Sequence, residues 1–238
     1  MTMNTNIKLA RIAGVLYLLI VIFGLIAQIF VRDNLVDYGN ATVTANNILN
    51  SESWYRFGFV SELLMLISDV GVAVILYIIL RDTNKNLAII TTAFRFSSII
   101  ILAVTALSHY AALSFLGGSE YLNVFNKDQL DAFALFSVRI HGVGYNISLL
   151  FFGTHLVLLG ILINHSIIFP KFLGILLFIG GFCYIGNSII WFQFPGWVKY
   201  IYPLIIIPSA ISEWIFCGYL IVKGIKVVSV QEKIQNEI

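Results

Sequence analysis

Six long apolar stretches divide this chain, and each is long enough to cross a bilayer as a helix. They cover residues 9–31, 56–80, 88–116, 133–163, 172–194 and 200–223. A spanning helix needs about 20 mainly apolar residues, and in lipid its backbone polar groups must be satisfied within the segment. Of the 238 residues, 59% are hydrophobic and only 11% are charged. The sequence therefore predicts an all-α, polytopic integral membrane six-helix bundle that forms a single membrane domain over residues 1–238.

The placement of Lys and Arg predicts that both termini are cytoplasmic, because cytoplasmic ends carry the excess of positive residues. One set of span ends carries Lys8, Arg11, Arg81, Lys85, Lys171, Lys223, Lys226 and Lys233, and the opposite set carries Arg32, Arg56, Lys127, Arg139 and Lys199. The first apolar stretch is longer than the core of a cleaved signal peptide, so we interpret it as a retained span. We expect a multi-pass protein of the cell inner (plasma) membrane. The net charge of +2 does not indicate a nucleic-acid partner.

Turn and cap signals occur in the connections between the spans. Residues 40–50 (NATVTANNILN) predict a short surface helix. Asn126 and Gln129 have the spacing of a capping box, which predicts that a helix begins near Lys127 and runs into the fourth span. The Pro195-Gly196 pair predicts a turn between the fifth and sixth spans.

Charged side chains within or against the apolar stretches indicate where the interior of the bundle is polar. They are Glu62, Asp69, Arg95, Arg139 and Glu213. An ionised group at bilayer depth costs at least ~2.5–3.5 kcal/mol, so it usually faces a partner or a wet cavity. These residues therefore predict polar contacts between the helices.

Helical spacing places polar side chains on one face of each of three successive spans. The faces contain Glu62, Met65 and Asp69 in the second span, Arg95, Ser98, Leu102, Thr105 and His109 in the third, and His141, Tyr145, Ser148 and His155 in the fourth. Depth estimated at 1.5 Å per residue divides the polar residues into two layers. The inner layer, roughly 10–17 Å from the cytoplasmic ends, contains Asp69, Arg95, His155 and Glu213. The outer layer, roughly 27–33 Å from the same ends, contains Glu62, His109, His141 and Tyr145.

The inner layer holds two carboxylates and one guanidinium. If Arg95 pairs with Asp69, then Glu213 needs a proton, a charged His155 or a bound cation. A structural ion pair with a protonated spare carboxylate and a proton- or cation-linked binding site both fit this arrangement. Pro208 lies five residues before Glu213, as in the broken helices of transporters, although prolines also occur in membrane helices without a site. The candidate ligand-binding residues are Asp69, Arg95, His155, Glu213, Glu62 and Tyr145.

Four histidines raise the question of haem or metal binding. His109 and His141 lie at similar depth on neighbouring spans, and with Glu62 they form a weak candidate metal trio. The sequence contains no CxxCH or HExxH motif, so hydrogen bonding is the favoured role and the sequence by itself predicts no metal site. The GxSxG, Walker and GxGxxG motifs are also missing. The catalytic residues and cofactors are therefore unknown, and it stays open whether the protein is an enzyme.

Several segments resemble one bacterial membrane family. They are residues 10–19 (ARIAGVLYLL), 45–52 (ANNILNSE), 56–64 (RFGFVSELL), 76–88 (LYIILRDTNKNLA), 94–95, 129–130, 141–146 (HGVGYN), 151–163 (FFGTHLVLLGILI) and 170–174 (PKFLG). This ordered set resembles the uncharacterised six-span family called domain of unknown function 4386. The resemblance implies a six-helix inner-membrane protein with no established activity. The family often has Asp in the second span where this chain has Glu62, and the resemblance transfers no catalytic residue.

Three classes of function fit these observations. The leading hypothesis is a protein that binds or transports a small or lipid-like ligand at a polar seam of spans two, three, four and six, with Asp69, Arg95 and Glu213 central. The second is an intramembrane enzyme or a haem or metal electron carrier that uses the histidine trio. The third is a membrane scaffold or partner subunit whose polar residues only lock the helices together. The lipid bilayer is the expected partner in all three, and self-association stays open.

Overall fold

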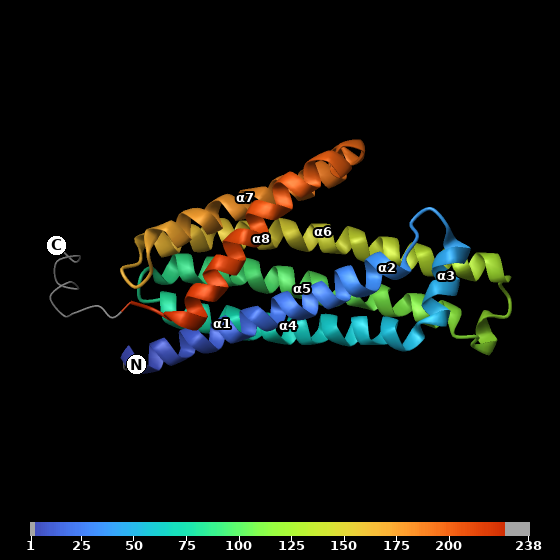
Figure 1. The fold of residues 1–238 in the computed structure, drawn as a ribbon, viewed down its shortest axis with the longest axis horizontal. Helices are drawn as coiled ribbons and strands as arrows, with labels where there is room; N and C mark the ends of the chain where they lie inside the picture. The colour runs from blue at the N-terminus through green and yellow to red at the C-terminus, as the bar shows by residue number, and fades with distance from the viewer. Residues whose placement is uncertain (1–2, 227–238) are drawn as a thin grey trace. The chain divides into compact units, whose positions relative to one another are not determined.

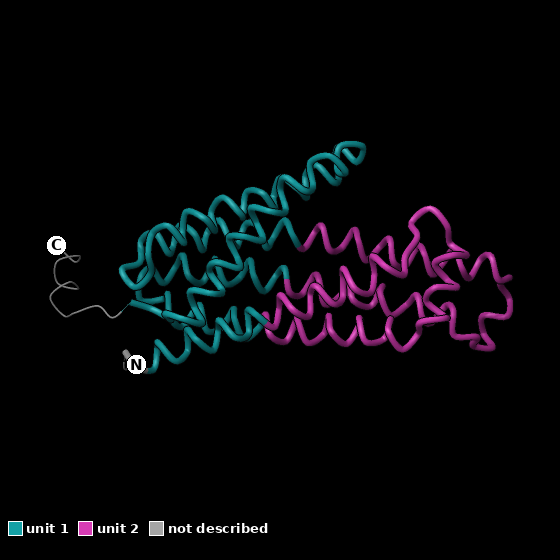
Figure 2. Tube along the Cα trace, viewed as in Figure 1, with its two compact units in different colours: residues 1–18, 70–98, 149–238 teal, residues 19–69, 99–148 magenta. Residues whose placement is uncertain are grey.

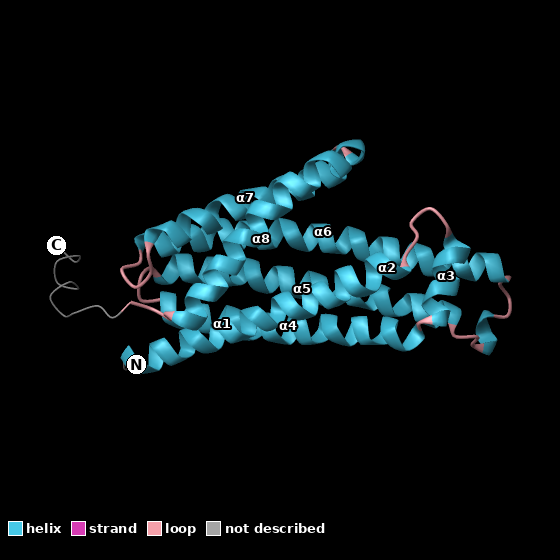
Figure 3. Cartoon of the chain, viewed as in Figure 1, coloured by secondary structure: helices cyan, strands magenta, loops and turns pink. Residues whose placement is uncertain are grey.

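The computed structural model describes residues 3–226, and these contain helices and loops but no strand (Figure 3). The helical segments are α1 (Met3–Leu25), the π-helix η1 (Ile26–Arg32), α2 (Asp33–Leu35), α3 (Ala41–Asn50), α4 (Glu52–Leu80), α5 (Lys85–Leu116), the 3-10 turn η2 (Glu120–Leu122), α6 (Lys127–His165), α7 (Lys171–Gln193), the 3-10 turn η3 (Pro195–Trp197) and α8 (Val198–Val222) (Figure 1). Lys233 lies outside the described residues.

Six helical segments are long and apolar enough to cross a membrane. They are Thr5–Leu35, Glu52–Leu80, Lys85–Leu116, Lys127–His165, Lys171–Gln193 and Pro195–Val222. Large apolar side chains on them stay exposed, including Ile67 at 69% and Leu107 at 68%. Such surfaces suit contact with lipid rather than with water. The predicted all-helical bundle of a multi-pass membrane protein is therefore confirmed.

The cap signals of the sequence also form as predicted. The backbone N–H of Asn126 donates to Gln129 Oε1 at 2.9 Å, and the N–H of Gln129 donates to Asn126 Oδ1 at 3.0 Å. This reciprocal pair satisfies two backbone donors at the start of α6, as a capping box should. At the start of α3 the cap is a single bond, in which the side chain of Asn40 accepts from the N–H of Val43 at 3.0 Å. Gly196 lies in the η3 turn before α8.

Two compact units make up the described chain (Figure 2). Within the described residues, unit 1 combines residues 3–18, 70–98 and 149–226, and unit 2 combines Leu19–Asp69 and Ile99–Ser148. The helices α1, α4, α5 and α6 each contribute one part to unit 1 and another to unit 2. Each unit therefore has its own packed interior and its own group of buried polar residues.

In unit 1, glycines bring α6 and α7 into close contact. A Cβ added to Gly181 of α7 would lie 2.6 Å from the backbone oxygen of Gly153 on α6. A Cβ on Gly174 would lie 2.6 Å from the backbone oxygen of Gly160. Small residues at such positions let membrane helices approach closely. The contact also positions the next turn of α7, which carries Tyr184.

In unit 2, apolar side chains form a compact core near α3. Its buried members are Val31, Leu35, Ile48, Tyr55, Ala112, Leu113, Ala134 and Val138. The hydroxyl of Tyr55 donates to the backbone oxygen of His109 at 3.0 Å, which joins α4 to α5. Arg139 is exposed, and its guanidinium donates to the backbone oxygen of Tyr38. Arg139 therefore contacts the loop before α3.

Candidate functional site

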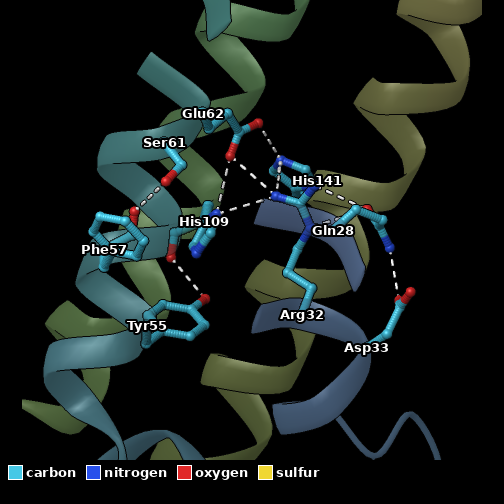
Figure 4. Close-up of polar contacts among 9 residues, drawn as sticks. All are labelled: Gln28, Arg32, Asp33, Tyr55, Phe57, Ser61, Glu62, His109 and His141. Carbon is cyan, nitrogen blue, oxygen red and sulfur yellow. Dashed lines mark hydrogen bonds and ion pairs between the residues drawn. The ribbon is translucent and has the colours of Figure 1, made fainter. Parts of the chain in front are cut away.

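Unit 2 contains a cluster of four buried ionisable side chains, named here the outer cluster. It consists of Arg32 at the end of η1, Glu62 on α4, His109 on α5 and His141 on α6. Their exposed fractions are 5%, 1%, 1% and 3%. Figure 4 shows Glu62, His109 and His141 pointing toward one another around the Arg32 guanidinium. Four separate helical segments thus place their polar side chains at one point.

The Glu62 carboxylate is the centre of the hydrogen bonding in the outer cluster. Its Oε2 lies 3.1 Å from Arg32 Nη1 and 3.0 Å from His109 Nδ1, and its Oε1 lies 2.7 Å from His141 Nε2. A buried carboxylate is costly unless it is paired and hydrogen-bonded. Here the guanidinium balances its charge and two imidazoles add further contacts.

Arg32 is the residue that the sequence reasoning missed. Its position after the first apolar stretch led us to place it at a span end, but the structure buries it inside unit 2. The helix continues beyond residue 31 through η1 and α2. The Glu62 carboxylate compensates the positive charge of the buried guanidinium. Gln28 could have indicated this, since it lies four residues earlier and its Oε1 accepts from Arg32 Nη2 at 2.8 Å.

His109 differs from the other members of the outer cluster in one respect. Its Nε2 is buried and has no hydrogen-bond partner among residues 3–226. The ring instead packs against aromatic side chains, with its centroid 4.5 Å from that of Tyr55 and 5.8 Å from that of Phe59. Buried polar atoms are nearly always paired, so an unpaired one calls for an explanation.

Unit 1 contains a second group of polar side chains, named here the inner cluster. It consists of Tyr17 on α1, Arg95 on α5, His155 on α6, Tyr184 on α7 and Glu213 on α8. Arg95 is fully buried, and its guanidinium carbon lies 5.2 Å from the ring centroid of Tyr17 and 5.4 Å from that of Phe152. Such cation–π contacts help to stabilise a charge that has been removed from water.

The hydrogen bonds of His155 assign the protonation state of its imidazole ring. Its Nδ1 lies 2.9 Å from the backbone oxygen of Thr91, which can only accept, so Nδ1 carries the proton. Its Nε2 lies 3.0 Å from Arg95 Nη1, which can only donate. His155 is therefore a neutral imidazole that accepts from Arg95.

Two tyrosine hydroxyls hold the Glu213 carboxylate. Tyr17 Oη donates to Oε2 at 2.7 Å, and Tyr184 Oη donates to Oε1 at 2.6 Å. Because the ring of Tyr17 also lies against Arg95, this residue connects the guanidinium to the carboxylate. Sequence reasoning missed both tyrosines, since most of their side chain is apolar and their hydropathy fits an ordinary membrane helix.

The structure brings together part of the set predicted from the sequence. Glu62, His109 and His141 of the outer layer meet in unit 2, and Arg95 meets His155 in unit 1. Glu213 also lies in unit 1, whereas Asp69 and Tyr145 are half-buried in unit 2. The pairing of Asp69 with Arg95 and the ligand-binding role of these residues stay predictions.

Two hollows lie in unit 1, and one of them is lined by a residue of the inner cluster. In unit 1, a cavity of about 10 Å³ is lined by residues that include Thr91, His155 and Leu159. This volume corresponds to about one water molecule. A second hollow of about 310 Å³ lies between α6 and α7, lined by Ile161, Asn164, His165, Ile175 and Phe178. His155 is the member of the inner cluster that lines the smaller cavity, and this cavity admits only a small ligand without movement of the helices.

Comparison with known proteins identifies relatives but no activity. The model of the family described as Domain of unknown function (DUF4386) matches residues 12–224. An uncharacterized protein of Archaeoglobus fulgidus is 30% identical over 174 residues, which cover 73% of this chain and 88% of that protein. No solved structure matches the chain.

Proposed function

Since this chain belongs to the DUF4386 family, whose description assigns no activity, we propose a function from the polar interior of the protein. We infer that it is a binding or transport-like membrane protein that takes a small ligand at the inner cluster. Arg95, His155 and Glu213 are the central residues of this proposal. The remaining candidates from the sequence, Asp69, Glu62 and Tyr145, lie in unit 2 and are not part of this proposed site.

The observation that carries the proposal is the connected arrangement around Glu213. The carboxylate accepts from Tyr17 and Tyr184, and Tyr17 links it to the Arg95 guanidinium. Opposite charges are held near each other by side chains that can donate or accept a proton. Pro208 lies within α8 five residues before Glu213, as in the proline-containing helices of transporter sites.

The size of the cavity limits what this cluster can take. A space of about 10 Å³ beside His155 admits a water molecule, a proton or a small ion, but not a lipid. The cavity is lined by residues of α4, α5 and α6, so a larger solute would require these helices to separate. We therefore favour a small ion, or a small solute whose binding is linked to one.

Native mass spectrometry of the detergent-purified protein tests the proposal most directly. We expect wild-type protein to carry a bound ion or small molecule that is lost in Glu213→Gln, because the neutral amide lacks the charge that holds it. Glu120→Gln is the matched control, since Glu120 is an exposed residue of η2. That variant should keep the bound mass. A mass that Glu213→Gln also keeps would belong to a different site.

A variant that neutralises the predicted inner charges together can show that the inner cluster is not a binding site. The variant Asp69→Asn, Arg95→Gln and Glu213→Gln should lose bound mass and change its thermal unfolding if the cluster is a binding site. Unchanged unfolding with no lost mass would show that these residues are not needed for binding. The scaffold hypothesis would then be preferred.

We also propose that both termini are cytoplasmic and that the protein lies in the cell inner (plasma) membrane. The burial of Arg32 removes one positive residue from the outer ends and strengthens the Lys and Arg bias. Single cysteines in the loop of residues 81–84 and in α3 should report this orientation. A membrane-impermeant thiol reagent applied to intact cells should label only the cysteine in α3.

A further inference from the structure

The outer cluster contains the side chains of a metal site, and the proposed function does not use them. Glu62, His109 and His141 each offer one ligand atom, and these atoms all lie within 4.8 Å of one another. Two imidazoles and one carboxylate form a common ligand set for Zn²⁺ and for non-haem Fe²⁺. Because three ligands leave further coordination positions open, such sites can also bind water or a substrate.

A cationic nitrogen already lies at the centre of these ligand atoms. Arg32 Nη1 is 3.1 Å from Glu62 Oε2, 3.3 Å from His109 Nδ1 and 3.4 Å from His141 Nε2. The three atoms therefore converge on one positively charged group, which marks the point where a metal ion would be attracted. Zinc–nitrogen and zinc–oxygen bonds are roughly 2.0–2.2 Å long, so each ligand would need to move inward by about 1 Å. Rotamer adjustments of long side chains can supply shifts of this size.

Arg32 has polar partners toward which its guanidinium can withdraw. Its Nε and Nη2 donate to Gln28 Oε1 at 3.1 and 2.8 Å, and Gln28 Nε2 donates to Asp33 Oδ1 at 2.7 Å. Asp33 is exposed, so this path leads away from the buried interior. Arg32 is also the last residue of the π-helix η1. Short π-helical segments are rare in proteins, and those that occur are often found at functional sites. A change of η1 toward α-helical geometry would turn Arg32 relative to α1.

The unpaired Nε2 of His109 is an independent sign that the hydrogen bonding of the outer cluster is incomplete. His109 is 1% exposed, and its Nε2 has no partner among the described residues. The hydrogen bonds therefore do not decide which ring nitrogen carries the proton. A metal ion on Nδ1 would decide it, because the proton would then stay on Nε2 beside the Tyr55 and Phe59 rings.

A single ion fits this arrangement better than haem. The His109 and His141 ring centroids are 5.6 Å apart, and both rings contact the same Glu62 carboxylate. Glu62 and Arg32 thus fill the space between the two imidazoles, where a bis-histidine haem would have to lie.

We propose that Glu62, His109 and His141 bind one divalent first-row transition-metal ion, of the Zn²⁺ or Fe²⁺ type, and that Arg32 occupies the same position in its absence. Metal and guanidinium compete for the three ligand atoms. Removing the guanidinium should therefore strengthen metal binding, whereas removing a histidine should weaken it.

The experiment uses tag-free, detergent-purified protein that has been treated with chelator and then titrated with ZnCl₂. Bound zinc is measured by elemental analysis after gel filtration, and affinity by competition with a chromophoric chelator. We expect one zinc ion per chain in wild type and at least ~tenfold tighter binding in Arg32→Met. Loss of a ligand should cost at least ~100-fold, since even partners outside the first coordination sphere contribute 10- to 100-fold. His109→Phe tests this, because a phenyl ring preserves the aromatic packing.

Matched variants separate this site from surface binding. His165→Gln removes an exposed histidine, and Arg139→Met removes an exposed arginine; both should leave stoichiometry and affinity unchanged. His141→Gln is the second ligand variant, which is used if His109→Phe does not elute as a single helical species. The proposal is overturned if folded wild type and folded Arg32→Met both fail to bind zinc. It is equally overturned if a folded ligand variant binds zinc as tightly as wild type.

Discussion

Breaking the buried ion pair of the outer cluster should cost far more stability than breaking the closer pair at the protein surface. Glu62 and Arg32 lie 3.1 Å apart with side-chain exposures of 1% and 6%. Replacing Glu62 by Gln keeps the shape of the side chain but leaves the guanidinium uncompensated in the interior. Breaking a buried pair in this way costs about 3–5 kcal/mol. We expect Glu62→Gln to lower the free energy of unfolding by this amount in chelator-containing buffer.

The matched control is Glu52→Gln, which breaks the exposed pair between Glu52 and Arg56. That pair is closer, at 2.6 Å, but its side chains are 45% and 50% exposed. Water and salt screen exposed charges, and such pairs often contribute nothing measurable. We therefore expect no resolved change in unfolding for Glu52→Gln. Burial, and not the distance between the charged atoms, should decide the effect.

A double-mutant cycle measured by thermal unfolding in detergent completes this test. The variant Arg32→Met with Glu62→Gln removes both charges, so neither group is left buried without a partner. Its loss of stability should be smaller than the sum of the two single losses by about 2 kcal/mol or more, as coupling between contacting charged residues predicts. Additive losses, or equal effects of Glu62→Gln and Glu52→Gln, would refute the reasoning.

Three further changes test the packing, the cap and the inner cluster. Gly181→Ala places a Cβ against the backbone of α6 and should destabilise the protein by about 1–3 kcal/mol. Gly186→Ala on the same helix meets no atom within 4 Å, so it should be neutral or stabilising by up to ~1 kcal/mol. Thermal unfolding of the two variants checks this difference. Asn126→Ala removes half of the capping box and should cost about 1 kcal/mol, seen as faster amide hydrogen exchange in the first turn of α6. Tyr17→Phe removes one donor to Glu213 and should cost about 1–3 kcal/mol in unfolding measurements if the carboxylate is charged, with the ring packing on Arg95 retained.

Local and compositional properties were enough to predict the helices. Length and hydropathy indicated six membrane-spanning helices, because a bilayer leaves the backbone few other ways to satisfy its polar groups. The start of α6 followed from Asn126 and Gln129, whose contacts involve only neighbouring residues. Helical periodicity also placed Glu62, His109 and His141 on interior faces, where the structure has them. Each of these properties depends on a short stretch of chain.

The partners of the buried charges depended on tertiary structure. Arg32 reaches Glu62 because the first membrane helix continues through a π-helical turn, and its apolar pattern does not encode that turn. Tyr17 and Tyr184 hold Glu213 because α1, α7 and α8 turn those particular faces toward one another, although α1 lies far from α8 in sequence. By itself the sequence determined that this chain crosses a membrane as six helices with polar groups inside. Only the packing of those helices decided which polar groups meet, since hydropathy specifies which side chains avoid lipid and not which partner each one finds.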